Sequence, residues 1–179
     1  QAKFDSISDL KTVDRVYLRG SFVNPLPQAL DNVVLVYRSS AYRFTSPIAA
    51  GGRQFIDPSD TPMNLNWLVT RRRTVETKDV STPWDPTSED IHRLVEMFTF
   101  YEAAGAENYT GLANRFYRPL DFSEHAAKGT AVLYARMAAP LRTPQIDSPH
   151  AAKGAERELE TWTFVRILLP VEFDRTARQ

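Results

Sequence analysis

The stretch SEDIHRLVEMFTFYEAAGAENYTG (Ser88–Gly111) decides the fold class, because it is the one strongly helical segment of a strand-rich chain. Thr87 or Ser88 can cap its start, and Gly105 stands where helices commonly end in a left-handed residue. Apolar residues recur along it at the spacing of one helical face. They are Ile91, Leu94, Val95, Phe98 and Tyr101. We therefore expect one amphipathic helix that packs on a sheet.

The same helix carries Glu89, His92 and Glu96 on one side, and the Glu-x-x-His spacing matches half of a carboxylate-bridged di-metal site. That chemistry needs a second such pair on a facing helix, and the sequence has none. His92 also lies on the side away from the apolar stripe. We therefore interpret these residues as a solvated helix face with i, i+4 contacts such as Glu89 with Arg93.

Segments rich in β-forming residues surround the helix. They are residues 12–24, 32–44, 65–80, 129–140 and 158–173. We expect the first two to pair as neighbours, and 32–44 to be one long strand whose polar half, from Arg38, extends past the core. A short strand ending near Leu120, followed by a turn or short helix, completes the set. This order predicts an α+β domain with a mainly antiparallel sheet of five to six strands and one principal helix on a face.

The length and composition indicate a single globular domain over residues 1–179. Hydrophobic residues make up 42% of the chain and charged residues 25%, which is typical of folded proteins. No apolar run reaches the length of a membrane span. Two long loops are expected near residues 45–63 and 142–157, and loops of that length are usually functional or disordered.

The composition and the motifs exclude several classes of function. The 22 basic and 22 acidic side chains cancel, so no nucleic-acid partner is expected. The absence of cysteine removes thiol catalysis, Cys-based zinc sites, iron–sulfur clusters and disulfides. There is no phosphate-binding loop, no nucleophile elbow, and no triad spacing among the three histidines. We therefore expect no catalytic residues, no cofactor and no metal, and the sequence favours a protein that is not an enzyme.

Three loops could instead form a contact surface for a protein partner, at 45–63, 142–157 and the helix end 105–115, and the arginine run at 71–73 could form a basic patch beside them. The candidate partner-binding residues are Phe55, Ile56, Arg71, Arg72, Arg73, Asn108, Tyr109 and Arg115. Polar and aromatic loops often bind ligands, although they also lock turns through side-chain hydrogen bonds. For the arginines, a charged edge strand that resists aggregation is the plainer interpretation.

These observations favour a non-enzymatic interaction or assembly domain, acting as a subunit of a larger complex that could include a membrane. Burial of Phe55, Ile56 or Tyr109 in a partner pocket would supply the binding free energy, with the arginines steering association. Two alternatives stay open. One is a small-molecule or lipid-binding domain with the ligand between helix and sheet. The other is a metal-dependent hydrolase that uses the helix acids and His92, or Asp121 and His125.

The chain begins at Gln1 rather than Met, so we expect a processed chain that a signal peptide or membrane anchor could precede. An extracytoplasmic location, periplasmic or membrane-anchored, is therefore favoured. A cytoplasmic location is the alternative.

Overall fold

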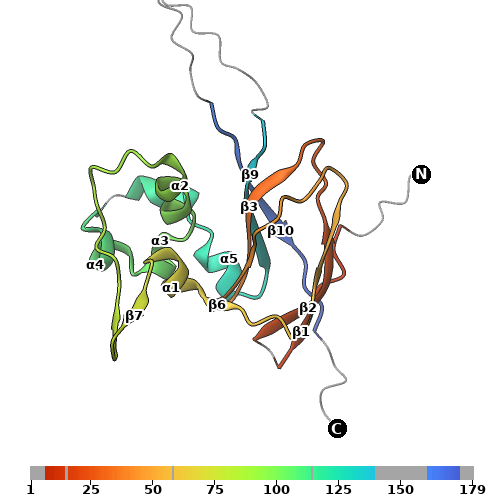
Figure 1. Cartoon of the computed structure of the whole chain (residues 1–179), viewed down its shortest axis with the longest axis horizontal. Coiled ribbons are helices and arrows are strands. Elements are labelled where there is room, and N and C mark those ends of the chain that lie inside the picture. Colours follow the sequence, from red (N-terminus) through yellow and green to blue (C-terminus); the bar gives the residue numbers. More distant parts are fainter. Residues whose placement is uncertain (1–6, 15, 58, 114, 140–160, 174–179) are drawn as a thin grey trace, which may run out of the picture.

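A computed structural model describes residues 7–14, 16–57, 59–113, 115–139 and 161–173 (Figure 1). These residues form three layers, which are a three-stranded sheet, a five-stranded central sheet and a layer of short helices. The strands of each sheet pair in antiparallel fashion. The predicted α+β class with a mainly antiparallel sheet is thus confirmed. The expected loop at 142–157 lies outside the described residues.

The central sheet contains β3, β4, β6, β9 and β10. Their bounds are Leu30–Tyr37, Ser40–Phe44, Met63–Asn64, Ala131–Met137 and Phe164–Leu169, and their order is β10-β9-β3-β4-β6. The two faces of β3 belong to two separate hydrophobic cores. Leu35 packs toward the three-stranded sheet, while Val34 and Val36 pack toward the helices. A strand buried on both faces has a continuous apolar sequence rather than an alternating one. The strands expected within 129–140 and 158–173 are confirmed as β9 and β10.

Residues 32–44 form a tight hairpin, so the prediction of one long strand is wrong. The chain turns at Arg38 and Ser39, and Tyr37 pairs with Ser40 across the turn. Arg38 has a φ of 53°, and a positive φ at the first turn residue is typical of two-residue hairpins. No Gly or Asn marks this turn in the sequence. The polar second half therefore returns along the sheet, where Ala41 is buried.

The three-stranded sheet contains β1 (Lys11–Val13), β2 (Tyr17–Val23) and β5 (Arg53–Ile56), in the order β1-β2-β5. The predicted pairing of 12–24 with 32–44 is wrong, because β2 pairs with β1 and β5 instead. The two segments meet face to face, with the buried Leu18 and Phe22 in the core between the sheets. The expected loop at 45–63 therefore contributes one strand to each sheet, β5 and β6.

Beyond β10, the chain reaches the three-stranded sheet and ties the two sheets together. The Thr12 amide donates to the Glu172 carbonyl at 3.0 Å, and the Glu172 amide donates to the Leu10 carbonyl at 2.9 Å. Backbone hydrogen bonds between β1 and the segment after β10 thus close the side of the core next to β10.

The helix layer covers the other face of the central sheet (Figure 1). Its elements are α1 (Leu65–Val69), α2 (Ile91–Thr99), α3 (Tyr101–Ala104), α4 (Ala106–Thr110), the 3-10 helix η1 (Arg115–Leu120) and α5 (Ser123–Ala127). The strand expected over 65–80 is replaced by α1 and a small hairpin, because Leu65, Leu68 and Val69 bury one helical face. A short helix after residue 120 is confirmed, whereas the strand ending near Leu120 is wrong. No helix in the described ranges combines the length and apolar character needed to cross a bilayer.

The predicted helix at 88–111 is divided into α2, α3 and α4. The N-cap of α2 is Asp90 rather than the expected Thr87 or Ser88, and the Asp90 side chain accepts a hydrogen bond from the Arg93 amide at 3.0 Å. Gly105 adopts the expected left-handed conformation, but α4 continues beyond it. The buried side of α2 also differs from the predicted stripe, since Ile91 is 50% exposed while Glu96 and Met97 are buried. The buried face of α2 is therefore rotated toward Glu96. A pattern of apolar residues does not predict that a glutamate lies in a core.

Gly20 allows a close approach between β2 and the segment before β1. Its φ is 115°, and a Cβ there would lie 2.5 Å from the Asp9 carbonyl oxygen. The approach lets the Asp9 carboxylate accept hydrogen bonds from the Ser21 amide and hydroxyl, at 2.5 and 2.8 Å. The Ser21 hydroxyl in turn accepts a hydrogen bond from Arg53 at 2.7 Å, which links β5 to the same point.

Gly20→Ala should therefore lower the free energy of unfolding by about 2–4 kcal/mol, because it adds both backbone strain and a clash. Gly51→Ala is the matched control, since Gly51 also has a positive φ, of 68°, but no atom within 4 Å of the added methyl. That control should cost about 1 kcal/mol. Urea unfolding of both variants measures the difference, and equal losses would contradict the close approach.

Candidate functional site

The predicted partner-binding residues do not gather on one surface. On β5, Phe55 is 67% exposed, whereas Ile56 is 3% exposed and packs in the core between the sheets. This placement corrects the expectation for Ile56, because strand alternation turns it inward when its neighbour faces out. Asn108 in α4 is exposed and Tyr109 is half-buried. Arg115 begins η1, and its side chain lies outside the described part of the chain.

The three consecutive arginines have three different environments as the chain leaves α1. Arg71 donates to Glu96, with 2.6 Å between Nη2 and Oε2. Arg72 lies 3.5 Å from the Asp79 carboxylate. Arg73 is exposed and has neither an ion pair nor a hydrogen-bonded side chain among the described residues. Arg71 and Arg72 therefore bind carboxylates within the fold, and only Arg73 of the run is available to a partner.

Glu96 is the centre of a buried ionic cluster on α2, which we call the Glu96 clamp (Glu96, Arg71 and Arg93). The Glu96 side chain is only 4% exposed, and its Oε2 also lies 3.5 Å from Nη1 of Arg93. Burial raises the pKa of Glu96, while the two guanidinium groups act in the opposite direction. The expectation of a solvated helix face is therefore wrong for Glu96, since two arginines compensate the carboxylate and allow it to be covered.

Glu96→Ala should destabilise the fold by about 2–4 kcal/mol, because two guanidinium groups would lose their buried partner. Glu89→Ala is the control, since Glu89 is an exposed carboxylate just before the same helix, and it should change stability by less than about 0.5 kcal/mol. Urea unfolding at neutral pH measures both effects. A loss for Glu96→Ala no larger than for the control would show that the clamp contributes nothing.

His92 is half-buried and packs against aromatic rings of the central sheet. Its ring lies 6.0 Å from that of Tyr134 and 5.8 Å from that of Phe164, nearly parallel to both. Burial lowers the pKa of His92. This placement corrects the expectation that His92 points away from the core, and it follows from the same rotation of α2 that buries Glu96.

The lowered pKa of His92 makes stability depend on pH. As pH falls below the ordinary histidine value of about 6.5, the unfolded chain takes up this proton before the folded chain does, so stability decreases. The free energy of unfolding should fall more steeply between pH 7.5 and 5.5 for the wild type than for His92→Phe, by at most about 1.4 kcal/mol per pH unit. Parallel slopes in urea unfolding would contradict this assignment.

The structure assembles neither of the hydrolase sets considered from the sequence. Glu96 holds two arginines and His92 is packed on rings, while Glu89 is exposed. The Asp121 carboxylate accepts from the Ser123 amide at 2.9 Å at the start of α5, and His125 is exposed. Within the described ranges, no group of three His, Cys, Asp or Glu residues could hold a metal ion.

A hairpin of β7 (Arg73–Val75) and β8 (Lys78–Val80) projects from the helix layer (Figure 1). All six strand residues are exposed. The register pairs Thr74 with Asp79, and these two side chains share a hydrogen bond of 2.9 Å on one face. The opposite face, which we call the hairpin face, consists of Arg73, Val75, Lys78 and Val80. Its two valines are 45% and 47% exposed.

The base of the hairpin is held firmly to the helix layer. The Thr82 amide donates to the Thr70 carbonyl at 3.0 Å, and the Thr82 hydroxyl donates to the Arg71 carbonyl at 3.3 Å. The Tyr109 hydroxyl donates to the Thr82 carbonyl at 2.5 Å and accepts from Arg93 at 3.2 Å. Tyr109 was expected to enter a partner pocket, but its hydroxyl connects the Glu96 clamp to the hairpin base instead.

Val75, Lys78 and Val80 are not among the residues predicted from the sequence, because residues 65–80 have the composition of a single strand. The available signal was the alternation in RTVETKDV, with a Glu-Thr turn between two short β-forming runs.

No protein-family model, curated protein or solved structure matches this chain. Function is therefore inferred from the contacts and exposed surfaces of the chain itself.

Proposed function

We propose that the chain is a non-enzymatic interaction domain that binds an acidic protein partner through the hairpin face. The observation that carries the proposal is the composition of this face, in which two exposed valines alternate with Arg73 and Lys78. Exposed β-branched pairs flanked by cations suit a partner that offers apolar side chains among carboxylates. The face would be a contact with a neighbouring subunit of a larger, extracytoplasmic complex.

A protective edge strand is a poorer explanation of this face. Charges alone would prevent strand-to-strand aggregation, and lysine is the usual residue for that purpose. Val75 and Val80 work against such protection, because an exposed β-branched surface favours association. A role in specific binding accounts for the cations and the valines together.

The anchored base supports binding in a second way. A two-stranded hairpin has little stability of its own, so its orientation depends on the contacts at its base. Here the hydrogen bonds of Thr82 and the ion pair between Arg72 and Asp79 hold that base. A surface held in place before binding loses less conformational entropy on association.

The test is affinity capture from extracts of the source cells at about 50 mM and 500 mM salt, which differ in Debye length by several-fold. A double variant on the hairpin face, Val75→Thr with Lys78→Glu, is compared with Phe55→Ser on the three-stranded sheet. The wild type and Phe55→Ser should retain one acidic protein at low salt. The double variant should lose at least about tenfold of it, and so should the wild type at high salt.

Two results would overturn the proposal. One is retention of the same partner by the double variant at wild-type level. The other is loss of the partner with Phe55→Ser alone, which would place the contact on β5 instead. Urea unfolding of each variant must give wild-type midpoints, so that a lost contact is not confused with lost folding.

A further inference from the structure

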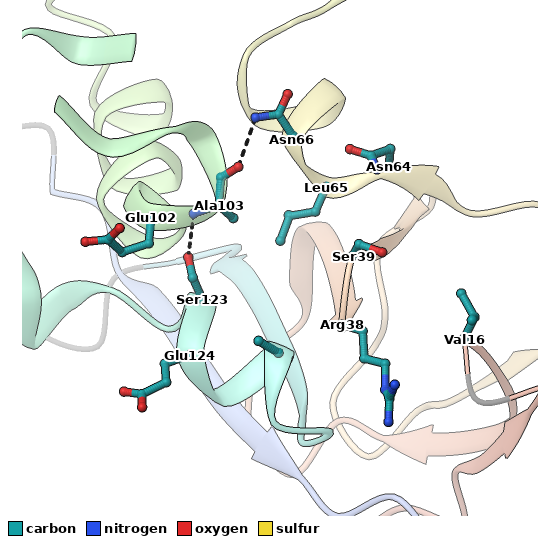
Figure 2. Close-up of a pocket in the computed structure, with 11 residues that line it drawn as sticks. Val16, Arg38, Ser39, Asn64, Leu65, Asn66, Glu102, Ala103, Ser123 and Glu124 are labelled. Carbon is teal, nitrogen blue, oxygen red and sulfur yellow. Dashed lines mark hydrogen bonds between the residues drawn. The ribbon is translucent and has the colours of Figure 1, made fainter. Parts of the chain in front are cut away.

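A pocket of about 690 Å³ lies where the β3–β4 turn meets α1, α3 and α5 (Figure 2). The apolar part of the lining, which we call the apolar wall, consists of Leu65, Ala103 and Ala127, and Val16 adds to it from the connection between β1 and β2. The Asn66 Nδ2 donates to the Ala103 carbonyl at 3.0 Å, and the Leu65 amide donates to the Ser39 carbonyl at 2.8 Å. Hydrogen bonds thus fix the backbone at Leu65 and Ala103, two of the apolar residues that line the pocket.

Arg38 brings the one cationic side chain to this lining. Its amide donates to the Ala126 carbonyl at 3.0 Å, which fixes the β3–β4 turn against α5. Its guanidinium carbon lies 5.7 Å from the ring centroid of Tyr37. The Nε atom is buried and has no hydrogen-bond partner among the described residues. Arg38 forms no ion pair with a carboxylate among the described residues, so its charge is available to an anionic ligand.

The neighbours of Arg38 also favour a ligand with acceptor oxygens. Ser39 supplies a hydroxyl, and Asn64 uses its Oδ1 to accept from the Trp67 amide at 3.3 Å, which leaves its Nδ2 as a donor. The acidic residues of the lining do not neutralise the arginine. Glu102 and Glu124 extend their carboxylates away from it (Figure 2), and Glu124 is paired with Lys128 at 2.5 Å.

We propose that this pocket binds a small organic carboxylate with an apolar body. The carboxylate would pair with the Arg38 guanidinium, whose planar donors match its two oxygens, and the apolar body would lie on the wall of Leu65, Ala103 and Ala127. The volume falls within the range of about 300–1,000 Å³ that small-molecule sites occupy. This site is separate from the hairpin face, and neither proposal depends on the other.

The probes are octanoate and its uncharged counterpart octanol, titrated into the isotope-labelled protein and followed by amide chemical shifts. Octanoate should shift signals of residues around the pocket, with at least tenfold higher affinity than octanol. Arg38→Gln should weaken octanoate by about tenfold or more and leave octanol unchanged. Ala127→Leu fills space beside the apolar wall and should weaken both probes. Glu107→Gln is the control, because Glu107 is an exposed carboxylate on α4 outside the lining, and it should change neither.

The outcomes that overturn the proposal are specific. They are equal affinity for octanoate and octanol, unchanged octanoate binding by Arg38→Gln, and shifts confined to residues away from the pocket. Absence of any shift with octanoate at several millimolar also overturns it. The folded state of Arg38→Gln is checked from its unshifted distant signals, and Arg38→Gly offers a second variant without the charge, since glycine adopts the positive φ of this turn at low cost.

Discussion

Burial of β3 on both of its faces constrains the rest of the structure. Its odd-numbered residues from Val33 to Tyr37 need the three-stranded sheet to cover them, and its even-numbered residues need the helices. β9 beside it has the same requirement, with Leu133 directed to one core and Tyr134 to the other. Neither outer layer has a core of its own without this pair of strands. The three-layer arrangement follows from two strands that can be exposed on neither side.

Much of the fold could be predicted from residue patterns, and the failures have local physical causes. The long apolar runs that became β3, β9 and β10 were recognisable, as was the helical region after residue 88. The β3–β4 turn was not predicted, because Arg38 occupies the positive-φ position at which glycine or asparagine usually marks a two-residue turn. α1 was missed because Trp67, Leu68 and Val69 also suit a strand, and tertiary packing decided between the two.

The candidate surfaces were less accessible to sequence reasoning, because they depend on pairing across the fold. From the sequence alone, Glu96 is expected to face solvent. It is buried because Arg71, which follows another helix, pairs with it. The arginine run was selected as a candidate partner-binding surface, but its first two members pair with carboxylates within the fold. The pocket at Arg38 gathers residues from five separate segments and leaves no motif in the chain. Burial of a charge and assembly of a lining are properties of the folded state alone.

The pairing of β3 with β9 also has a consequence for how the chain folds during synthesis. Val34 pairs with Tyr134, so one hundred residues separate partners in the centre of the sheet, and the helix layer is encoded between them. At about 5–20 residues per second, a ribosome needs roughly 5–20 s to reach the second strand after finishing the first. Throughout that interval the apolar β3–β4 hairpin has no permanent cover. A domain with such distant pairings is expected to fold slowly. Its nascent chain exposes apolar surface of the kind that chaperones bind.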